Sequence, residues 1–106
     1  MVLLPLTQAD GQTKPRPAVV LRELPCFGDW LVCGLSTQLH EYIAGFDELV
    51  GAGDGDFVGS GLVQPSVIRL GFLQAAPLRR IMGRIGSISA ERHRRLLANL
   101  AHHLAP

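Results

Sequence analysis

Hydrophobic residues along this chain fall into short runs that polar residues, glycines and prolines separate. The clearest runs are Val2–Leu6, Ala18–Leu21, Trp30–Leu35 and Ser66–Leu73. Runs of this length, rich in β-branched residues and bounded by turn formers, are typical of β-strands. Ala18–Leu21 is continuously apolar, which predicts a strand buried on both faces. Because proline donates no backbone hydrogen bond, we expect Pro17 to begin that strand rather than lie inside it.

The pattern changes to a helical period near the end of the chain. Ser89 is a suitable N-cap, and Glu91 follows in the first turn, where a negative charge favours the helix dipole. Beyond them, apolar residues recur at spacings of three and four and form one stripe: Leu96, Leu97, Leu100, Ala101 and Leu104. The sequence therefore predicts one C-terminal helix that packs on the sheet or on a partner subunit.

The segments between these elements carry weaker signals. Thr7–Lys14 is predicted to be a polar loop, Ala75–Arg80 one helical turn, and Ile81–Ile85 a short strand. Leu39–Ser60 is acidic and rich in glycine, so we expect a mobile, irregular loop with a possible short strand at Phe46–Val50. Short antiparallel strands followed by one helix predict a mainly β protein, a small and partly open barrel.

Length and composition limit the possible classes. The 106 residues correspond to a single domain, 1–106, and 47% apolar residues exclude a disordered chain. We expect no membrane span and no signal peptide, hence a cytoplasmic protein, because the N-terminus lacks basic residues and Pro5 interrupts its apolar run. Cys26 and Cys33 do not have metal-knuckle spacing, and we interpret both as reduced, half-buried residues.

Charge is unevenly distributed although the net charge is only +1. The segment from Glu41 to Asp56 contains five acidic residues and no lysine or arginine, whereas arginines dominate the last third of the chain. Such asymmetry either builds a basic face on a neutral protein or produces two solvated surfaces, and the sequence leaves both open.

Arg16 is the first candidate for a functional site, because Pro15 and Pro17 restrict the backbone on both sides of it. A guanidinium held in this way can grip two phosphate oxygens, although a structural ion pair at the entrance of the strand is the alternative. Ser36, Thr37 and Gln38 follow a predicted strand and can bind a phosphate or a base edge, or simply satisfy loop backbone.

Other candidates are weaker. Ser66 and Arg69 are of the same kind, and His40 could carry a proton but is more typical of a solvated loop histidine. His102 and His103 are adjacent on a helix and point about 100° apart, so they are poorly placed to share a metal. We find no nucleotide-binding glycine loop and no nucleophile or metal motif, so no cofactor and no metal are expected.

The ordered set of segments resembles the MazF/PemK family of toxins from type II toxin–antitoxin pairs. The matching pieces are Lys14–Val20, Leu35–Gln38, Ser60–Leu62, Ser66–Val67, Ile85–Ser89 and the closing helix. The resemblance implies a small SH3-like antiparallel barrel of the CcdB/Kid/MazF kind, a homodimer, and a metal-independent endoribonuclease that cuts single-stranded RNA at specific sequences. It implies catalytic roles for Arg16 and Ser36.

The resemblance also implies RNA-binding roles for Lys14, Thr37, Gln38 and Ser66, and a cognate antitoxin with a flexible acidic tail as partner. The sequence departs from the family in two places. Ser36 stands where threonine is usual and keeps the hydroxyl. Gln64–Ser66 stands where some members carry an Arg-x-Asp pattern with a catalytic part.

Two other functions remain open. The first is a catalytically degenerate barrel that only binds an antitoxin or RNA, and the Gln64–Ser66 departure favours it. The second is gyrase poisoning, as in the related CcdB toxins. Those toxins depend on C-terminal aromatic residues, and His102–Pro106 contains none. Under the ribonuclease hypothesis, Arg16 stabilises the charge of the phosphorane, Ser36 orients the phosphate and Gln38 lines the groove.

Overall fold

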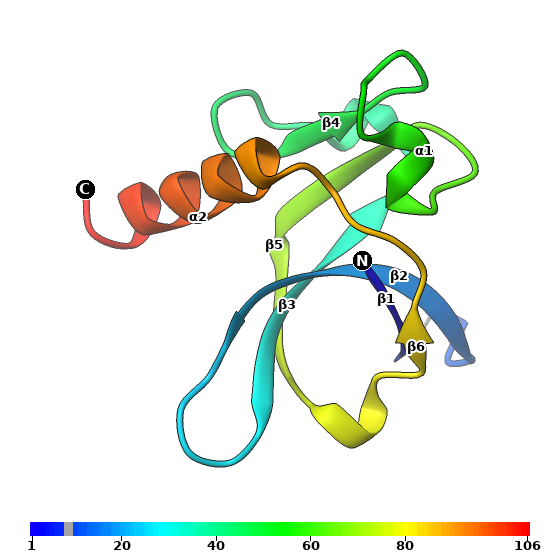
Figure 1. Cartoon of the computed structure of the whole chain (residues 1–106), viewed down its shortest axis with the longest axis vertical. Coiled ribbons are helices and arrows are strands. Elements are labelled where there is room, and N and C mark those ends of the chain that lie inside the picture. Colours follow the sequence, from blue (N-terminus) through cyan, green and yellow to red (C-terminus); the bar gives the residue numbers. More distant parts are fainter. Residues whose placement is uncertain (8–9) are drawn as a thin grey trace.

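In the computed structural model, which describes residues 1–7 and 10–106, six strands form one antiparallel sheet that curls on itself without closing. The order of strands in this sheet is β4-β5-β3-β2-β1-β6 (Figure 1). The strands are β1 (Val2–Thr7), β2 (Thr13–Glu23), β3 (Asp29–Ser36), β4 (Glu48–Val50), β5 (Ser66–Pro77) and β6 (Gly83–Arg84). The prediction of a mainly β, partly open barrel with a C-terminal helix is confirmed.

Strand β2 begins earlier than predicted and contains both prolines. The predicted loop Thr7–Lys14 was wrong at Thr7, Thr13 and Lys14, which belong to β1 and β2, and its residues 8 and 9 lie outside the described part of the chain. Pro15 pairs with Pro5 of β1, and Pro17 pairs with Leu3. The carbonyl of Leu3 accepts a hydrogen bond from Met82 beside β6, so Leu3 points its backbone groups away from β2. Pro15 and Pro17 therefore occupy non-hydrogen-bonded positions of the β1–β2 pair. Their backbone groups point to the other edge of β2, which pairs with β3 only from Ala18 onward. The expectation that Pro17 could not lie inside a strand was wrong, because the edge of β2 to which its backbone points is unpaired at this position.

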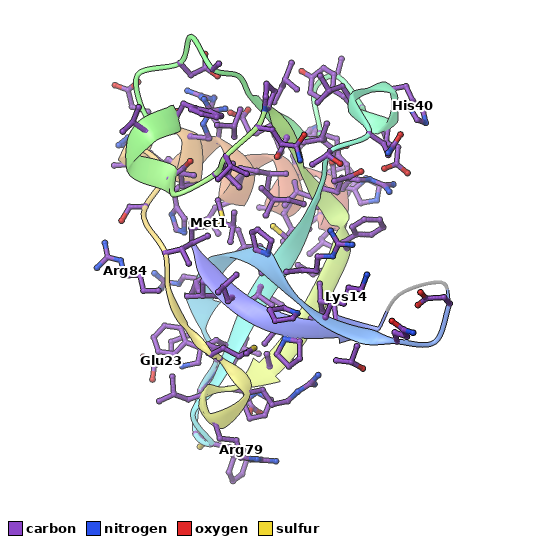
Figure 2. All side chains as sticks on the ribbon, turned by 90° about the vertical axis from the view of Figure 1, so that its right-hand side faces the viewer. Met1, Lys14, Glu23, His40, Arg79 and Arg84 are labelled. Carbon is purple, nitrogen blue, oxygen red and sulfur yellow. The ribbon has the colours of Figure 1, made fainter. Side chains whose placement is uncertain are left out.

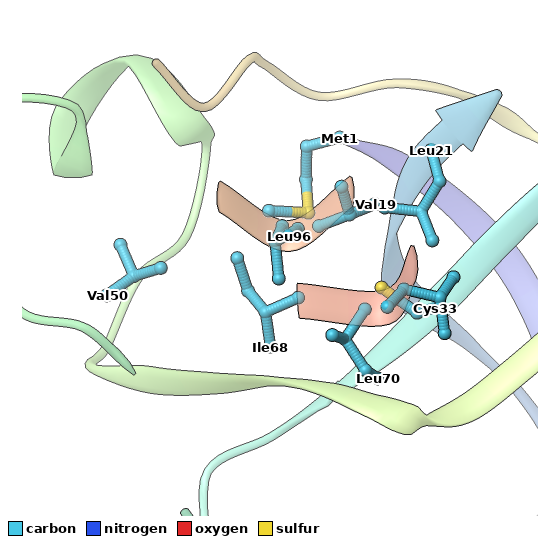
Figure 3. Close-up of a cluster of buried hydrophobic side chains, with 9 residues drawn as sticks. Met1, Val19, Leu21, Cys33, Val50, Ile68, Leu70 and Leu96 are labelled. Atoms are coloured by element: carbon cyan, nitrogen blue, oxygen red, sulfur yellow. The ribbon is translucent and has the colours of Figure 1, made fainter. Parts of the chain in front are cut away.

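The core lies between the curled sheet and α2 (Ala90–Leu104). The Ser89 hydroxyl accepts a hydrogen bond from the backbone N–H of Arg92 at 3.1 Å, which confirms the predicted N-cap. Leu96 of α2 is completely buried among Val19 and Ile68 of the sheet (Figure 3). The end of the apolar stripe is not covered, since Leu104 is 69% exposed. Helix α2 therefore packs on the sheet through its first turns.

The acidic segment is more ordered than predicted. It contains the short 3-10 helix η1 (Leu39–Glu41), β4, and α1 (Phe57–Ser60). Strand β4 lies within the short strand expected at Phe46–Val50. The expectation of an irregular loop was wrong for these three pieces, because tertiary contacts with α2 and β5 hold them.

Arg92 of α2 connects the acidic segment to the helix. Its buried guanidinium donates to Asp56 Oδ2 at 2.8 Å, to Glu48 Oε1 at 3.1 Å and to Asp54 Oδ2 at 3.2 Å. The hydrogen bond from Arg92 lowers the pKa of Asp56 from 3.8 to about 2. Arg95 adds a contact of 2.8 Å to Glu48. Part of the arginine-rich third thus neutralises the acidic segment, so the acidic and basic stretches are not two separate solvated surfaces.

Three further sequence predictions are corrected in detail. The helical turn is limited to η2 (Leu78–Arg80), because residues 75–77 continue β5. The last strand is limited to Gly83–Arg84. Cys26 is exposed in a turn with φ +84°, whereas Cys33 is buried, and desolvation raises the pKa of its thiol to about 12. Within the described residues, no helix is long and apolar enough to cross a membrane.

Candidate functional site

A groove of about 890 Å³ opens where β2 and β3 separate. The two strands are paired as far as Ala18 and Gly34. Beyond this pair, β2 continues along β1, while β3 continues along β5. The space between the diverging strands is lined by Pro5, Leu6, Arg16, Pro17, Ala18, Gly34, Leu35, Ser36, Thr37, Gln38, Glu41, Leu62, Ser66, Phe72, Leu73, Gln74 and Arg80. We refer to this space as the β2–β3 groove.

An irregularity in β5 places an aromatic ring in the groove. Between two paired stretches, the single residue Gly34 of β3 faces residues 69–72 of β5. The ring of Phe72 packs on Gly34, where a Cβ atom would lie 3.3 Å from the Cβ of Phe72. Phe72 remains 47% exposed, and the Arg69 guanidinium carbon lies 4.1 Å from its ring centroid. The groove therefore has one aromatic wall, the ring of Phe72, which makes a cation–π contact with Arg69.

Five of the six residues predicted for the site line this groove: Arg16, Ser36, Thr37, Gln38 and Ser66. They come from β2, from β3 and the residues after it, and from the start of β5. The sixth, Lys14, is exposed on β2 opposite Leu6 and is not among the lining residues (Figure 2). His40, also labelled there, is exposed on η1 and does not line the groove.

Ser36 is held by two hydrogen bonds. Its Oγ donates to Glu41 Oε1 at 2.5 Å and accepts from the backbone N–H of Gln38 at 3.0 Å. The other oxygen of Glu41 accepts from Arg69 Nη1 at 3.3 Å. Both carboxylate oxygens of Glu41 are thus engaged by described residues, and the orientation of its side chain is fixed.

Thr37 and Gln38 are exposed, whereas Ser66 is 2% exposed. The Ser66 hydroxyl donates to the carbonyl of Gln64 at 3.0 Å. A ligand that used the Ser66 hydrogen would have to replace this bond, so Ser66 shapes the wall more readily than it binds.

The sequence-based interpretation missed three side chains that change the chemistry of the groove: Glu41, Phe72 and Arg80. In the sequence, Glu41 stands out only as one of the acidic residues, and Phe72 only as an apolar residue of the predicted strand Ser66–Leu73. Arg80 donates to the carbonyl of Pro5 at 3.4 Å, which holds it beside β1. The one available signal was the five-residue spacing of Ser36 and Glu41, which a single helical turn can bring together.

A second cavity, of about 630 Å³, lies between the β2–β3 hairpin and α2 and contains none of the predicted site residues. His93 lines it and contacts the carbonyl of Val20 through Nε2 at 3.0 Å. In residues 1–7 and 10–106, no group of three or more His, Cys, Asp or Glu side chains could hold a metal ion. The β2–β3 groove is therefore the better candidate, since it combines two guanidinium groups, three hydroxyls, a carboxylate and an aromatic face.

Comparison with known proteins gives a consistent result. The sequence profile of the family described as "PemK-like, MazF-like toxin of type II toxin-antitoxin system" matches residues 1–104. The fold is similar to that of the Mycobacterium tuberculosis toxin MazF-mt6, with a TM-score of 0.67, 22% identity, and coverage of 98% of this chain and 96% of that one.

A second solved structure, described as an Mtb toxin, is similar with a TM-score of 0.64 and 19% identity. The similarity covers 94% of this chain and 97% of that one. No curated protein sequence matches this chain.

Proposed function

Because this chain belongs to the PemK-like, MazF-like toxins of type II toxin–antitoxin systems, we propose that it is a metal-independent endoribonuclease that cuts single-stranded RNA in the β2–β3 groove. Members of this family are generally endoribonucleases, and the family implies an antitoxin as partner. The observation that carries the proposal is the position of Arg16 across the groove from Ser36, Thr37 and Gln38.

RNA can be cleaved by its own 2′-hydroxyl, which attacks the adjacent phosphorus. The reaction needs an aligned hydroxyl, stabilisation of the extra negative charge on the phosphorane, and proton transfers at both oxygens. The Arg16 guanidinium can supply the charge stabilisation through two parallel hydrogen bonds to phosphate oxygens. Ser36 lies at the opposite wall, where it can contact the reacting nucleotide.

The exposed face of Phe72 supports a single-stranded substrate. Bases that are not paired can stack on aromatic side chains, whereas the bases of a duplex are already stacked on one another. Gln38 and Gln74 in the same groove can donate to and accept from base edges. These contacts would give both the preference for single strands and the choice of bases.

The experiment compares two arginines on the same strand. Arg16→Ala removes the groove guanidinium, whereas Arg22→Ala removes an exposed arginine that does not line the groove. Each purified protein is incubated with a long single-stranded RNA in the presence of a chelator, and cleavage rates and product ends are measured. We expect Arg16→Ala to cleave about 100- to 1000-fold more slowly and Arg22→Ala to cleave at nearly the parental rate.

The products should carry 2′,3′-cyclic phosphate and 5′-hydroxyl ends. Absence of cleavage by the parent protein under these conditions would refute the ribonuclease proposal. Cleavage by Arg16→Ala at the parental rate would refute the role of Arg16.

A binding-only module is the second candidate. The engagement of the Ser66 hydroxyl by Gln64 favours it, because this segment replaces the Arg-x-Asp pattern of some family members. A protein of this kind would bind the same RNA, or an antitoxin, but would not cut the RNA. Fluorescence anisotropy with labelled RNA, measured beside the cleavage assay, separates the two functions.

Partners and location complete the proposal. We propose a homodimer in the cytoplasm, with the exposed apolar residues Val58 and Val63 available for contacts between subunits. An antitoxin with a flexible acidic tail would bind over Arg16 and Arg80 in the groove. Arg92 is unsuitable for this contact because three acidic residues of the same chain already surround it.

A further inference from the structure

The proposed mechanism lacks an acceptor for the proton of the attacking 2′-hydroxyl, and the wall of the groove opposite Arg16 contains a suitable pair. We propose that Ser36 and Glu41 act as a proton relay, in which Ser36 takes the proton of the 2′-hydroxyl as its own proton passes to Glu41. This inference rests on the proposed ribonuclease activity. It gives Glu41 the role of proton acceptor, for which the sequence offered only His40 as a weak candidate.

The hydrogen bonds of Ser36 define the direction of the relay. A serine hydroxyl has one hydrogen to donate and two lone pairs to accept. The hydrogen is directed at Glu41 Oε1 over 2.5 Å, and the N–H of Gln38 occupies one lone pair at 3.0 Å. Ser36 can therefore accept one more hydrogen bond but has none left to donate. A 2′-hydroxyl is a donor and fits this position, whereas an ionised phosphate oxygen is an acceptor and does not.

The contacts of Glu41 suit a carboxylate that accepts a proton from Ser36. Arg69 Nη1 holds Glu41 Oε2 at 3.3 Å, so that Oε1 stays directed at Ser36. Arg69 is itself fixed by its position over the ring of Phe72, at 4.1 Å, and its Nε atom is buried without a hydrogen-bond partner among the described residues. The Glu41 side chain is 32% exposed, so it can return its proton to water after each turnover.

The atoms balance over the whole step. The 2′-hydroxyl gives its proton to Ser36 Oγ while Ser36 gives its own to Glu41 Oε1, and the electron pair of the 2′-oxygen forms the new bond to phosphorus. The bond from phosphorus to the 5′-oxygen breaks, and that oxygen takes its electron pair and then a proton from water. The hydroxide that remains removes the proton from Glu41. The products are a 2′,3′-cyclic phosphate and a 5′-hydroxyl, and Arg16 stays charged throughout.

The test uses single-turnover cleavage of an RNA oligonucleotide taken from a cleavage site mapped with the parent protein. Glu41→Gln keeps the size of the side chain and an oxygen that can accept from Ser36, but it cannot take up the proton. Glu91→Gln, on the exposed first turn of α2, is the matched control. We expect Glu41→Gln to lose about 100- to 10,000-fold in rate and the control to keep the parental rate.

Two further measurements separate proton transfer from a structural role. Ser36→Ala, Glu41→Gln and the double variant should show similar losses, because the members of a relay act as one unit and their effects do not multiply. The parental rate should fall in acid, where the carboxylate takes up a proton before the reaction, and this fall should be absent in Glu41→Gln. The parental profile alone keeps the inference testable if a variant does not fold.

The outcomes are distinct. A parent protein that cleaves no RNA refutes both the proposed function and the relay. A parent that cleaves RNA, combined with a Glu41→Gln variant of parental rate, refutes the relay and leaves the ribonuclease function standing. A parental rate that does not fall on acidification, or losses that multiply in the double variant, also refutes the relay.

Discussion

Substitution of Arg92 by methionine tests how the acidic segment is attached to the rest of the protein. The Arg92 side chain is 8% exposed and is surrounded by Asp56, Glu48 and Asp54, while Arg92 Nη1 also donates to the carbonyl of Leu49 at 2.9 Å. Methionine keeps much of the volume and removes every one of these hydrogen bonds. Asp56, whose side chain is 11% exposed, then loses its main partner, and Glu48, 14% exposed, keeps its contacts with Arg95.

The magnitude follows from the contacts and from the pKa of Asp56. A pKa lowered from 3.8 to about 2 corresponds to at most about 2 kcal/mol of stability, and solvent near this carboxylate reduces that value. The carbonyl of Leu49 adds the cost of an unpaired group, and Glu48 loses one of its two arginine partners among the described residues. We therefore expect Arg92→Met to lower the free energy of unfolding by about 2 to 4 kcal/mol at neutral pH.

The dependence on pH has a definite sign. Because the pKa of Asp56 is lower in the folded protein, its contribution is fully present above about pH 4 and is lost as the pH falls towards about 2. The parent protein should therefore lose more stability between these pH values than Arg92→Met does. Urea unfolding, followed by fluorescence of Trp30 at several pH values, measures both quantities.

Arg95→Met is the matched control, because Arg95 also contacts Glu48 but its side chain is 52% exposed. We expect little change in stability for this variant. An Arg92→Met protein as stable as the parent, or one that keeps the full loss of stability on acidification, would show that the ion pairs do not hold the acidic segment in place.

Two other predictions concern the groove and the thiols. Phe72→Ala should weaken binding of single-stranded RNA by about 5- to 150-fold, as expected for the loss of one stacked base. Phe27→Ala, at an exposed position outside the groove, should leave the affinity unchanged. Equal affinities of Phe72→Ala and the parent in an anisotropy titration would exclude stacking on Phe72. In the folded protein at neutral pH, only the exposed thiol of Cys26 should react with a thiol reagent, because burial raises the pKa of Cys33 to about 12. Both thiols should react in denaturant. Rapid reaction of two thiols in the folded protein would contradict the burial of Cys33.

Much of the sheet could be predicted because its strands have local signals. The apolar run Ala18–Leu21 and the capped helix that begins after Ser89 are each defined by neighbouring residues. The segment from Leu39 to Ser60 was harder to predict, because its order depends on Arg92, which lies more than thirty residues further along the chain. A glycine-rich acidic sequence contains no local sign that a distant arginine will neutralise it.

The candidate site was predicted in part for the same reason. Arg16 and Ser36 have recognisable neighbours, namely two prolines and a Thr-Gln pair. Phe72 was not found, because its exposure depends on the irregular pairing in which Gly34 faces four residues of β5. Glu41 was not found, because its contact with Ser36 requires the turn at η1. Features that depend on strand register or on a turn between elements are not visible in a hydrophobic pattern.

The two prolines beside Arg16 have a consequence for which molecules can occupy the groove. Where β2 leaves β3, the backbone groups of residues 13, 15 and 17 point into the gap, and of these only Thr13 has an N–H to donate. This edge offers carbonyl oxygens almost alone, so an extended peptide cannot join the sheet here as an additional strand. An antitoxin segment in the groove would have to bind through its side chains, and two toxin chains would not join edge to edge at this point. The protein can thus keep this edge of β2 open to a nucleic acid without the risk that other chains pair with it and aggregate.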